Sequence, residues 1–305
     1  MVVTAVVCTA GLLIASRSVV DGVPRVSGLD DVLSDPSDNI VNYLLVGSDS
    51  RANGDPNTGQ GGDTSGNRSD TIMVLRFDKS SESASLLSIP RDLWVQVPTR
   101  TGKINGAYND GPAALIQTVK DALQLPIHHY VEIDFYGFKS LIDALDGVDV
   151  CFEHPTRDLN TGLNIVEPGC FLLNGTEALA YARSRHFEEF KDGDWYEDPT
   201  SDLGRSRRQR DFVNRSLQKA IQKVKGDPFV TGDLVRSISA AIRIDEDLDP
   251  IDAAASLRTA VGAGLKSYSL PVGPTKIDGQ DVLLLDDDAA VVLAYFRGEG
   301  PAPEV

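Results

Sequence analysis

The sequence has few basic residues for its length, and this shortage limits the functions it could have. It carries 29 lysine and arginine residues against 45 aspartate and glutamate residues, a formal net charge of −16 over 305 residues. A nucleic-acid-binding protein needs a basic surface to neutralise phosphates, so no nucleic-acid partner is expected. The sequence also lacks a helix-turn-helix pattern and any repeat with a period of roughly 20–50 residues, which argues against a transcription regulator, a solenoid and a propeller.

A long apolar segment is missing as well. Residues 2–15 are almost entirely apolar and are followed by Arg17, but a run of roughly 15 residues is shorter than the ~20 that span a bilayer as a helix. The basic flank expected on the cytoplasmic side is absent too. We expect residues 1–16 to be a single-pass membrane anchor whose upstream part is missing, with the rest of the chain outside the cytoplasm. A short signal peptide is the alternative.

Cysteine is scarce. Cys8 lies in the apolar run, which leaves Cys151 and Cys170. A location outside the cytoplasm permits a disulfide between these two, which would close a loop of about 19 residues and add roughly 3 kcal/mol in the chain-entropy model. Two unrelated buried thiols are the alternative. We favour the bridge, because it would fix the loop just before Arg183.

Strands and helices alternate along the rest of the chain. Residues 17–40 are rich in Ser, Asp, Gly and Pro and indicate a linker, and residues 49–69 indicate a long loop. The patterns predict strands over 42–48, 70–78, 84–89, 94–97, 129–135, 148–152, 266–270 and 281–285, and helices over 112–125, 137–145, 174–183, 204–224, 230–242, 250–262 and 289–296. This order predicts one α/β domain over residues 41–300, a layered sheet with helices on its faces.

Two aspartates stand where predicted strands begin or end. Asp49 follows the strand 42–48, and Asp70 opens the next strand. If these strands are neighbours, the loop between them brings both carboxylates to one sheet edge, where they suit Mg²⁺ that shares phosphate oxygens. Each aspartate alone is explained as a turn or cap residue. The flanking Arg51 and Arg68 make a metal–phosphate site the better interpretation of the pair.

Arginine is concentrated in one segment of this acidic chain, at positions 183, 185, 205, 207, 208, 210 and 215. Arg205, Arg208 and Gln209 share one side of the predicted helix by their spacing, and this side leads into an apolar stripe. It therefore points into a pocket, whereas Arg207 and Arg210 are expected in solvent. A solvated helix face paired with the acidic residues 188–202 is the alternative.

Two further cations and a histidine are candidates for the same site. Arg91 ends a strand in Ile-Pro-Arg-Asp, and a guanidinium there presents a rigid fork of donors to phosphate. Lys103 precedes Ile-Asn-Gly-Ala-Tyr and is either a second cation of the site or a surface lysine. His186 follows two arginines; a neutral structural role is favoured over a role as a base.

Taken in order, these motifs resemble the LytR-CpsA-Psr family of bacterial cell-wall glycopolymer transferases. The matching segments are GSDSR (47–51), RSDT (68–71), SIPRD (88–92), KINGAY (103–108), DFYGFKSLIDALDGVDV (134–150), LNGTEALAYARSRH (173–186) and GRSRRQR (204–210). The resemblance implies a three-layer α/β/α sandwich with a mixed central sheet and a hydrophobic tunnel for a polyprenyl chain. The long acidic segment 187–203 and the long loop after Arg51 depart from the family pattern, and we expect both at the mouth of the site.

The resemblance also implies an activity. It is a phosphotransferase that moves a glycopolymer from a polyprenyl-pyrophosphate carrier to peptidoglycan as a phosphodiester, with Mg²⁺ or Mn²⁺ as cofactor. The metal ligands carried over by motif are Asp49 and Asp70, the catalytic residues are these two with Arg91, Arg183 and Arg185, and the pyrophosphate contacts are Arg51, Arg68, Arg91, Lys103, Arg183, Arg185, Arg205, Arg208 and Gln209. The alternatives are a pyrophosphatase with the same site, and a non-catalytic binder of wall polymer or lipid carrier.

Overall fold

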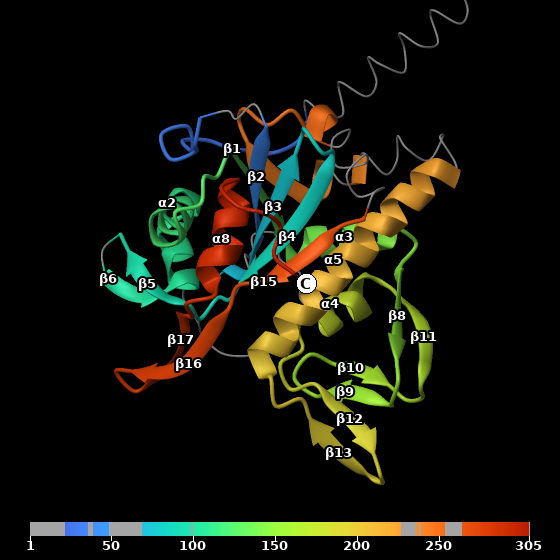
Figure 1. The fold of residues 1–305 in the computed structure, drawn as a ribbon. Coiled ribbons are helices and arrows are strands. Elements are labelled where there is room, and N and C mark those ends of the chain that lie inside the picture. Colours follow the sequence, from blue (N-terminus) through green and yellow to red (C-terminus); the bar gives the residue numbers. More distant parts are fainter. Residues whose placement is uncertain are drawn as a thin grey trace, which may run out of the picture.

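A mixed seven-stranded sheet forms the centre of the protein (Figure 1). The computed structural model describes residues 22–35, 39–48, 69–98, 100–226, 236–237, 239–253 and 264–304. The strands, in spatial order, are β1 (Arg25–Val26), β14 (Ile242–Asp245), β7 (His129–Asp134), β2 (Ile40–Ser48), β3 (Ser69–Asp78), β4 (Ser83–Ile89) and β15 (Lys266–Ser269). Three strand pairs are parallel (β1–β14, β7–β2 and β4–β15) and three are antiparallel (β14–β7, β2–β3 and β3–β4), so the sheet is mixed, as predicted.

Helices cover both faces of this sheet. The helices α2 (Pro112–Leu123) and α8 (Ala289–Arg297) lie on one face, and α5 (Ser201–Gly226) crosses the other, with α3 (Phe135–Ala144) and α4 (Gly175–Arg183) beside it (Figure 1). The predicted three-layer α/β/α sandwich is therefore confirmed. The polyprenyl tunnel stays a prediction.

The strands are apolar on both sides because both sides are covered. Successive side chains of a strand point to opposite faces, so Leu44 packs into the core beneath α2 and α8, whereas Leu45 packs toward α5. The first core includes Ile72, Val74, Leu87, Ile89, Leu115, Ile116, Val119, Val292, Leu293 and Phe296. The second core is smaller, with Met73, Leu75, Phe77 and Leu86 facing Val213 and Leu217 of α5.

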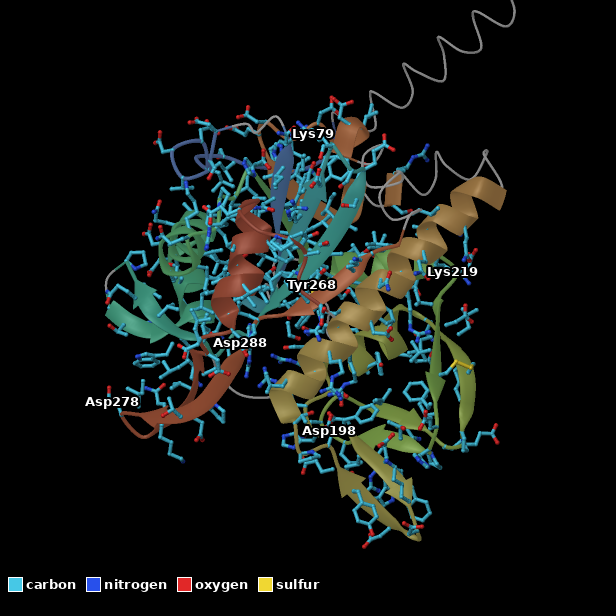
Figure 2. All side chains as sticks on the ribbon, in the orientation of Figure 1. Lys79, Asp198, Lys219, Tyr268, Asp278 and Asp288 are labelled. Carbon is cyan, nitrogen blue, oxygen red and sulfur yellow. A yellow bond between two sulfur atoms is a disulfide. The ribbon has the colours of Figure 1, made fainter. Side chains whose placement is uncertain are left out.

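Beyond the central sheet, short strands form two smaller sheets next to α4 and α5. One has the order β10 (Leu163–Ile165), β9 (Thr156–Asp158), β12 (Glu188–Lys191), β13 (Asp194–Glu197), and the other pairs β8 (Val148–Phe152) with β11 (Gly169–Leu173). Cys151 and Cys170 are directly opposite in β8 and β11 and form a disulfide, visible as a yellow bond in Figure 2, which confirms the predicted bridge. Since β11 leads into α4, the bridge fixes the segment just before Arg183.

Two hairpins and a 3₁₀ helix complete the described fold. They are β5 (Trp94–Val97) with β6 (Arg100–Lys103), the 3₁₀ helix η1 (Ile104–Asp110), and β16 (Val272–Ile277) with β17 (Gln280–Leu285). The prediction missed β6, β14, β16 and most strands of the smaller sheets, and it assigned no structure to residues 187–203, where β12 and β13 form a hairpin. Except for the six-residue β16, these strands have only three to five residues and show too few alternations to be recognised from sequence.

The predicted linker is corrected by the structure over residues 22–35. Strand β1 pairs with β14 in parallel, and Val23, Val26 and Leu29 are buried, at 3%, 7% and 2% exposure. Three apolar side chains, spaced by three residues among small and polar ones, are enough to fix this segment onto the sheet. Within the described part of the chain, no helix has the length and apolar character needed to span a membrane. The anchor predicted over residues 1–16 lies outside the described residues.

Candidate functional site

Four strands of the central sheet begin or end at one edge. The parallel strands β2 and β7 end together, with Ser48 beside Asp134. Strand β3 begins there with Ser69 opposite Ser48, and β4, antiparallel to β3, ends there at Ile89. Arg91 follows the end of β4 by two residues, and α3 starts directly after Asp134. This edge therefore gathers four of the predicted motifs, which are far apart in sequence.

Several predicted site residues cannot be placed here. Asp49, Arg51 and Arg68 lie outside the described residues, as does the side chain of Asp70, whose backbone belongs to β3. Within the part of the chain that the structure describes, no three His, Cys, Asp or Glu side chains form a group that could hold a metal. The predicted metal pair of Asp49 and Asp70 thus stays a prediction.

Three of the predicted arginines share one cavity, which we call the arginine pocket. Arg183 comes from the end of α4, Arg185 from the turn that follows, and Arg205 from the beginning of α5. The cavity has a volume of about 270 Å³, and its other lining residues are Asp158, Asn160, Thr161 and His186. This volume lies just below the ~300–1,000 Å³ typical of small-molecule pockets, and so suits a charged headgroup better than an entire ligand.

Packing fixes the orientation of these arginines. The Arg183 guanidinium lies over the Phe135 ring at 4.5 Å, at the beginning of α3. Arg205 is only 2% exposed. One turn later, Gln209 donates from Nε2 to the Ala182 carbonyl at 3.0 Å, which packs α5 against α4. The predicted pocket-facing side of α5 is thereby confirmed for Arg205, although Gln209 itself contacts α4 and does not line the pocket.

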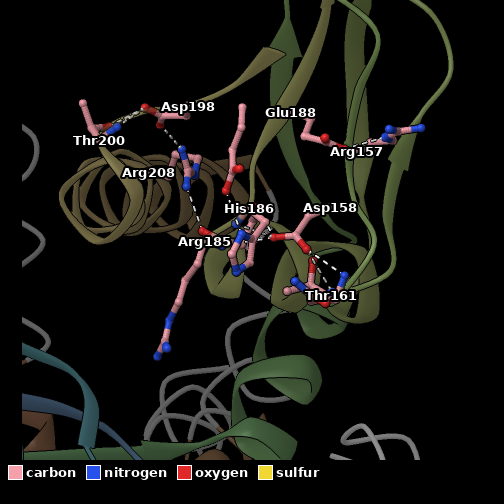
Figure 3. A network of polar contacts seen from close by, with 12 residues as sticks. Arg157, Asp158, Thr161, Arg185, His186, Glu188, Asp198, Thr200 and Arg208 are labelled. Atoms are coloured by element: carbon pink, nitrogen blue, oxygen red, sulfur yellow. Dashed lines mark hydrogen bonds and ion pairs between the residues drawn. The ribbon is translucent and has the colours of Figure 1, made fainter. Parts of the chain in front are cut away.

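Arg208 has a supporting position. Its guanidinium donates to Asp198 Oδ2 at 2.9 Å (Figure 3) and to the Ser184 carbonyl at 2.7 Å. It also lies over the Phe187 ring at 4.3 Å. These contacts connect α5 and the β12–β13 hairpin to residues 184–186, which follow α4 and which we call the arginine turn. Arg208 is not among the residues that line the arginine pocket, so its predicted contact with pyrophosphate stays a prediction.

Asp158 is a member of the site that sequence reasoning missed. Its fully buried carboxylate accepts from Ser184 Oγ at 2.7 Å and from the backbone N–H groups of Arg185 and His186 at 3.0 and 3.1 Å (Figure 3). Burial by itself would raise the pKa of Asp158, but hydrogen bonds from Ser184 and from backbone N–H groups outweigh it and keep that pKa below its ordinary value. Asp158 therefore stays ionised and holds the arginine turn in place.

The Arg91 and Lys103 motifs meet at one carboxylate. Lys103 Nζ lies 2.8 Å from Asp92 Oδ1, and Arg91 Nε lies 3.5 Å from Asp92 Oδ2. Backbone hydrogen bonds from Ile104 N to Leu93 O and from Asn105 N to Arg91 O tie the two segments together. Lys103 is thus paired with Asp92 beside Arg91, and its predicted contact with pyrophosphate stays a prediction.

Glu132 is a second residue that the sequence did not indicate. It is 1% exposed and accepts from Ser48 Oγ at 2.8 Å, Tyr108 OH at 2.6 Å and Tyr130 OH at 3.1 Å. Burial, with Glu132 nearby, raises the pKa of Tyr108, which therefore remains a donor. Glu132 links the end of β2 to the KINGAY segment. The available signal was an acidic residue between the apolar Val131 and Ile133, on the side of the strand that also carries Tyr130.

His186 is exposed, and its Nδ1 lies 2.7 Å from Glu197 Oε1. This contact joins the rim of the arginine pocket to β13. The acidic segment therefore borders the pocket as an ordered hairpin, held by contacts with Arg208 and His186.

Known proteins share this chain's sequence and fold. LcpB of Corynebacterium glutamicum, a probable cell wall biosynthesis protein, is 35% identical over 261 residues, which cover 83% of this chain and 60% of LcpB. The polyisoprenyl-teichoic acid–peptidoglycan teichoic acid transferase TagU of Halalkalibacterium halodurans is 36% identical over 209 residues, which cover 68% of this chain and 61% of TagU. The chain thus spans about three fifths of the length of these relatives.

The fold similarity extends over nearly the whole chain. The LytR-Csp2A-Psr enzyme from Actinomyces oris matches with a TM-score of 0.71 at 26% identity, over 90% of this chain and 95% of that one. The model of the LytR_cpsA_psr family matches residues 22–295, which include β1 at the start and most of α8 at the end. The chain is therefore a member of the LytR-CpsA-Psr family, which is associated with the bacterial cell wall.

Proposed function

We propose that this protein is a phosphotransferase that moves a glycopolymer from a polyprenyl-pyrophosphate carrier to peptidoglycan. The observation that carries the proposal is the arginine pocket, where Arg183, Arg185 and Arg205 converge beside the sheet edge that bears Arg91. Guanidinium forks match phosphate oxygens, and three of them in one small cavity favour a doubly charged headgroup. The name of TagU, a related transferase, supports the same donor and acceptor classes.

The reaction we propose is an in-line displacement at the phosphorus nearest the glycan. An acceptor hydroxyl of peptidoglycan forms the new O–P bond, the bond from that phosphorus to the bridging oxygen breaks, and polyprenyl phosphate leaves with the electron pair. The hydroxyl proton passes to a carboxylate, for which Asp70 is our choice. Such transfer needs mainly positioning and neutralisation of charge, which Arg183, Arg185 and Arg205 provide from packed positions.

We propose Asp49 and Asp70 as the holders of Mg²⁺, or of Mn²⁺ in its place. Ser48 and Ser69, their neighbours in the chain, pair across β2 and β3, with an irregular register at Gly47 and Ser48. Asp49 is next in sequence to Ser48, and the backbone of Asp70 lies between Ser69 and Thr71 in β3; two carboxylates so connected suit a hard cation that retains several water ligands. When bound, the cation would neutralise pyrophosphate charge.

We also propose that the domain works outside the cytoplasm and is anchored to the cell membrane by residues 1–16. The Cys151–Cys170 disulfide supports an oxidising compartment, because such bonds are rare in the cytosol. A polyprenyl carrier is a membrane lipid, so an anchor would keep the domain close to its donor.

Transfer from a purified lipid-linked donor to peptidoglycan tests this function. Arg183→Gln with Arg185→Gln should reduce transfer at least about 100-fold, since two charge-assisted contacts are lost, and Asp49→Ala should abolish it. Arg215→Gln is the matched control, because Arg215 pairs with Asp211 on the surface of α5 and should transfer normally. Wild-type transfer by Asp49→Ala would refute the metal site.

The same assay separates the alternatives. A pyrophosphatase releases its products at the same rate with and without peptidoglycan, whereas a transferase needs the acceptor. A non-catalytic binder retains the donor without turnover. Chelation of divalent cations should stop transfer, and Mg²⁺ or Mn²⁺ should restore it.

A further inference from the structure

A second cavity lies on the other side of α5. Its volume is about 940 Å³, and it is an open groove lined by α5, the beginning of β15 and residues 302–304. Arg207 and Arg210 line it from the helix, and Lys266 lines it from the strand. At 3.6 residues per turn, Arg207 is directed about 200° away from Arg205 around the helix. The two cavities share no lining residue.

Arg207 and Arg210 are not paired with the carboxylates that line the same cavity. Among the residues that the structure describes, no carboxylate forms an ion pair with the guanidinium of Arg207 or Arg210. Of the two carboxylates that line the cavity, Asp211 is already 2.6 Å from Arg215 Nε. The other, Glu304, is exposed. Each of the other three arginines on this stretch of α5, at positions 205, 208 and 215, either is buried in the arginine pocket or pairs with a carboxylate.

The position of Arg210 is the unexpected one. The sequence predicts Arg210 in solvent, but the structure partly buries it, and burial followed by the charge of Arg207 lowers its pKa. Its guanidinium still remains charged at neutral pH. A cation that has lost water and lies next to a like charge is unfavourable unless an anion joins it.

We propose that Arg207, Arg210 and Lys266 form a second phosphate-binding site, distinct from the arginine pocket. The two guanidinium groups would donate in forked pairs to phosphate oxygens, and the Lys266 ammonium would add a third positive charge from the opposite wall. The ligand is a phosphate monoester group, supplied either by free phosphate or by the headgroup of a lipid. This site is independent of the proposed transfer reaction.

Phosphate titration by calorimetry tests the site. The measurement uses the full chain carrying Arg183→Gln and Arg185→Gln, so that the arginine pocket contributes little. This background should bind one inorganic phosphate, and adding Arg207→Gln and Arg210→Gln should weaken binding by about tenfold or more. Lys219→Gln is the control: Lys219 does not line the cavity and pairs with Asp149 at 3.2 Å, so this change should leave the affinity unchanged. Glu304→Gln should increase it, because a carboxylate at the cavity wall repels phosphate.

Two results would overturn the proposal: no phosphate binding in the background chain, or binding that the Arg207→Gln, Arg210→Gln pair does not alter. Lys266→Gln provides a second test if the arginine pair impairs folding, because Lys266 is exposed on a short strand; it should weaken binding several-fold. Unchanged affinity in a folded Lys266→Gln chain removes the lysine from the site and contradicts the proposal as stated.

Vesicles distinguish the source of the phosphate. Phosphatidic acid, a phosphate monoester, is compared with phosphatidylcholine by co-sedimentation of the otherwise wild-type chain and of the Arg207→Gln, Arg210→Gln chain. Selective loss of binding to phosphatidic acid in the double variant identifies a lipid headgroup. Equal sedimentation of both chains, together with the calorimetric loss, identifies free phosphate.

Discussion

At the scale of single residues, the side chains proposed to face a ligand were easier to predict from the sequence than the side chains that position them. Helical spacing was enough to single out Arg205, because its neighbours one turn away lead into the apolar face of α5. Asp158 and Glu132 could not be found this way, since their partners are 26 and 84 residues away in the sequence. Long-range hydrogen bonds leave no local pattern; the only trace is an acidic residue where an apolar one is expected.

Asp158→Asn tests whether this carboxylate positions the arginine turn. The amide places an NH₂ group where an oxygen now accepts from Ser184 Oγ, Arg185 N and His186 N. Charge-assisted hydrogen bonds contribute about 1.5–3 kcal/mol each, so we expect a loss of roughly 2–4 kcal/mol in the free energy of unfolding. Pyrophosphate binding should weaken about tenfold, beyond what the folded fraction explains.

Urea unfolding and calorimetry with pyrophosphate measure the two effects of Asp158→Asn. Asp149→Asn is the control: its carboxylate is 63% exposed and pairs with Lys219 at 3.2 Å, and such surface pairs contribute little. A folded Asp158→Asn protein that binds pyrophosphate like the wild type would show that Asp158 stabilises the loop without positioning the arginines.

At the scale of elements, the accuracy of the sequence prediction follows element length. Helix 112–125 was predicted within two residues of α2, and 204–224 within three of α5, because both repeat an apolar face over several turns. The strands of the smaller sheets are only three to five residues long, and one of their pairings, β9 with β12, joins residues 31 positions apart. The sequence prediction also missed β1, because this strand has only two residues and its pairing partner, β14, is far along the chain.

Close contact between α3 and α4 depends on one glycine. Gly175 opens α4, its N–H donates to Asp143 Oδ1 at 2.7 Å, and a Cβ built there would collide with the Lys139 backbone. Since that obstacle is main chain, Gly175→Ala must push α4 and its Arg183 away from α3. We expect about 1–3 kcal/mol of destabilisation, typical of overpacking, and weaker pyrophosphate binding.

Gly300→Ala is the matched control for Gly175→Ala. There the nearest atom to the added Cβ would be Ala294 Cβ at 3.6 Å, an ordinary contact, so stability and binding should not change. Chemical unfolding of both variants provides the comparison. Equal stability of the two proteins would mean that the α3–α4 contact adjusts without cost.

At the scale of the whole molecule, acidity and anion binding coexist because positive charge is segregated. The net charge is −16, yet three arginines line a single cavity and three further cations line another on the opposite side of α5. Composition predicts no nucleic-acid partner, but it cannot reveal that the positive charges are separated. Their separation depends on which face of α5 packs against α4 and which faces the sheet. The second cavity in particular involves Lys266, some 60 residues beyond Arg207, and no periodicity connects them.

The pH dependence of global stability should contain a contribution from one buried histidine. Burial, followed by the charge of His129, lowers the pKa of His128 to about 4, against an ordinary value of 6.5. In the fold its Nδ1 accepts the Asn42 N–H at 2.9 Å, which requires an unprotonated nitrogen. The unfolded chain therefore takes up a proton first as pH falls, so this stabilisation is complete above pH 6.5 and is lost between about pH 6.5 and 4.

The size of this loss follows from the shift in pKa, at about 1.4 kcal/mol per unit, and reaches roughly 3 kcal/mol at most. His128→Gln removes the titrating group, so the difference in unfolding free energy between wild type and variant should shrink as pH falls from 7.5 to 4.5. Urea unfolding at several pH values measures this difference. His129, which contacts Asp245 at 3.3 Å, remains in both proteins, so its contribution largely cancels. Parallel stability curves across that range would mean that His128 titrates normally in the folded protein, and that the core beside β2 admits its charge.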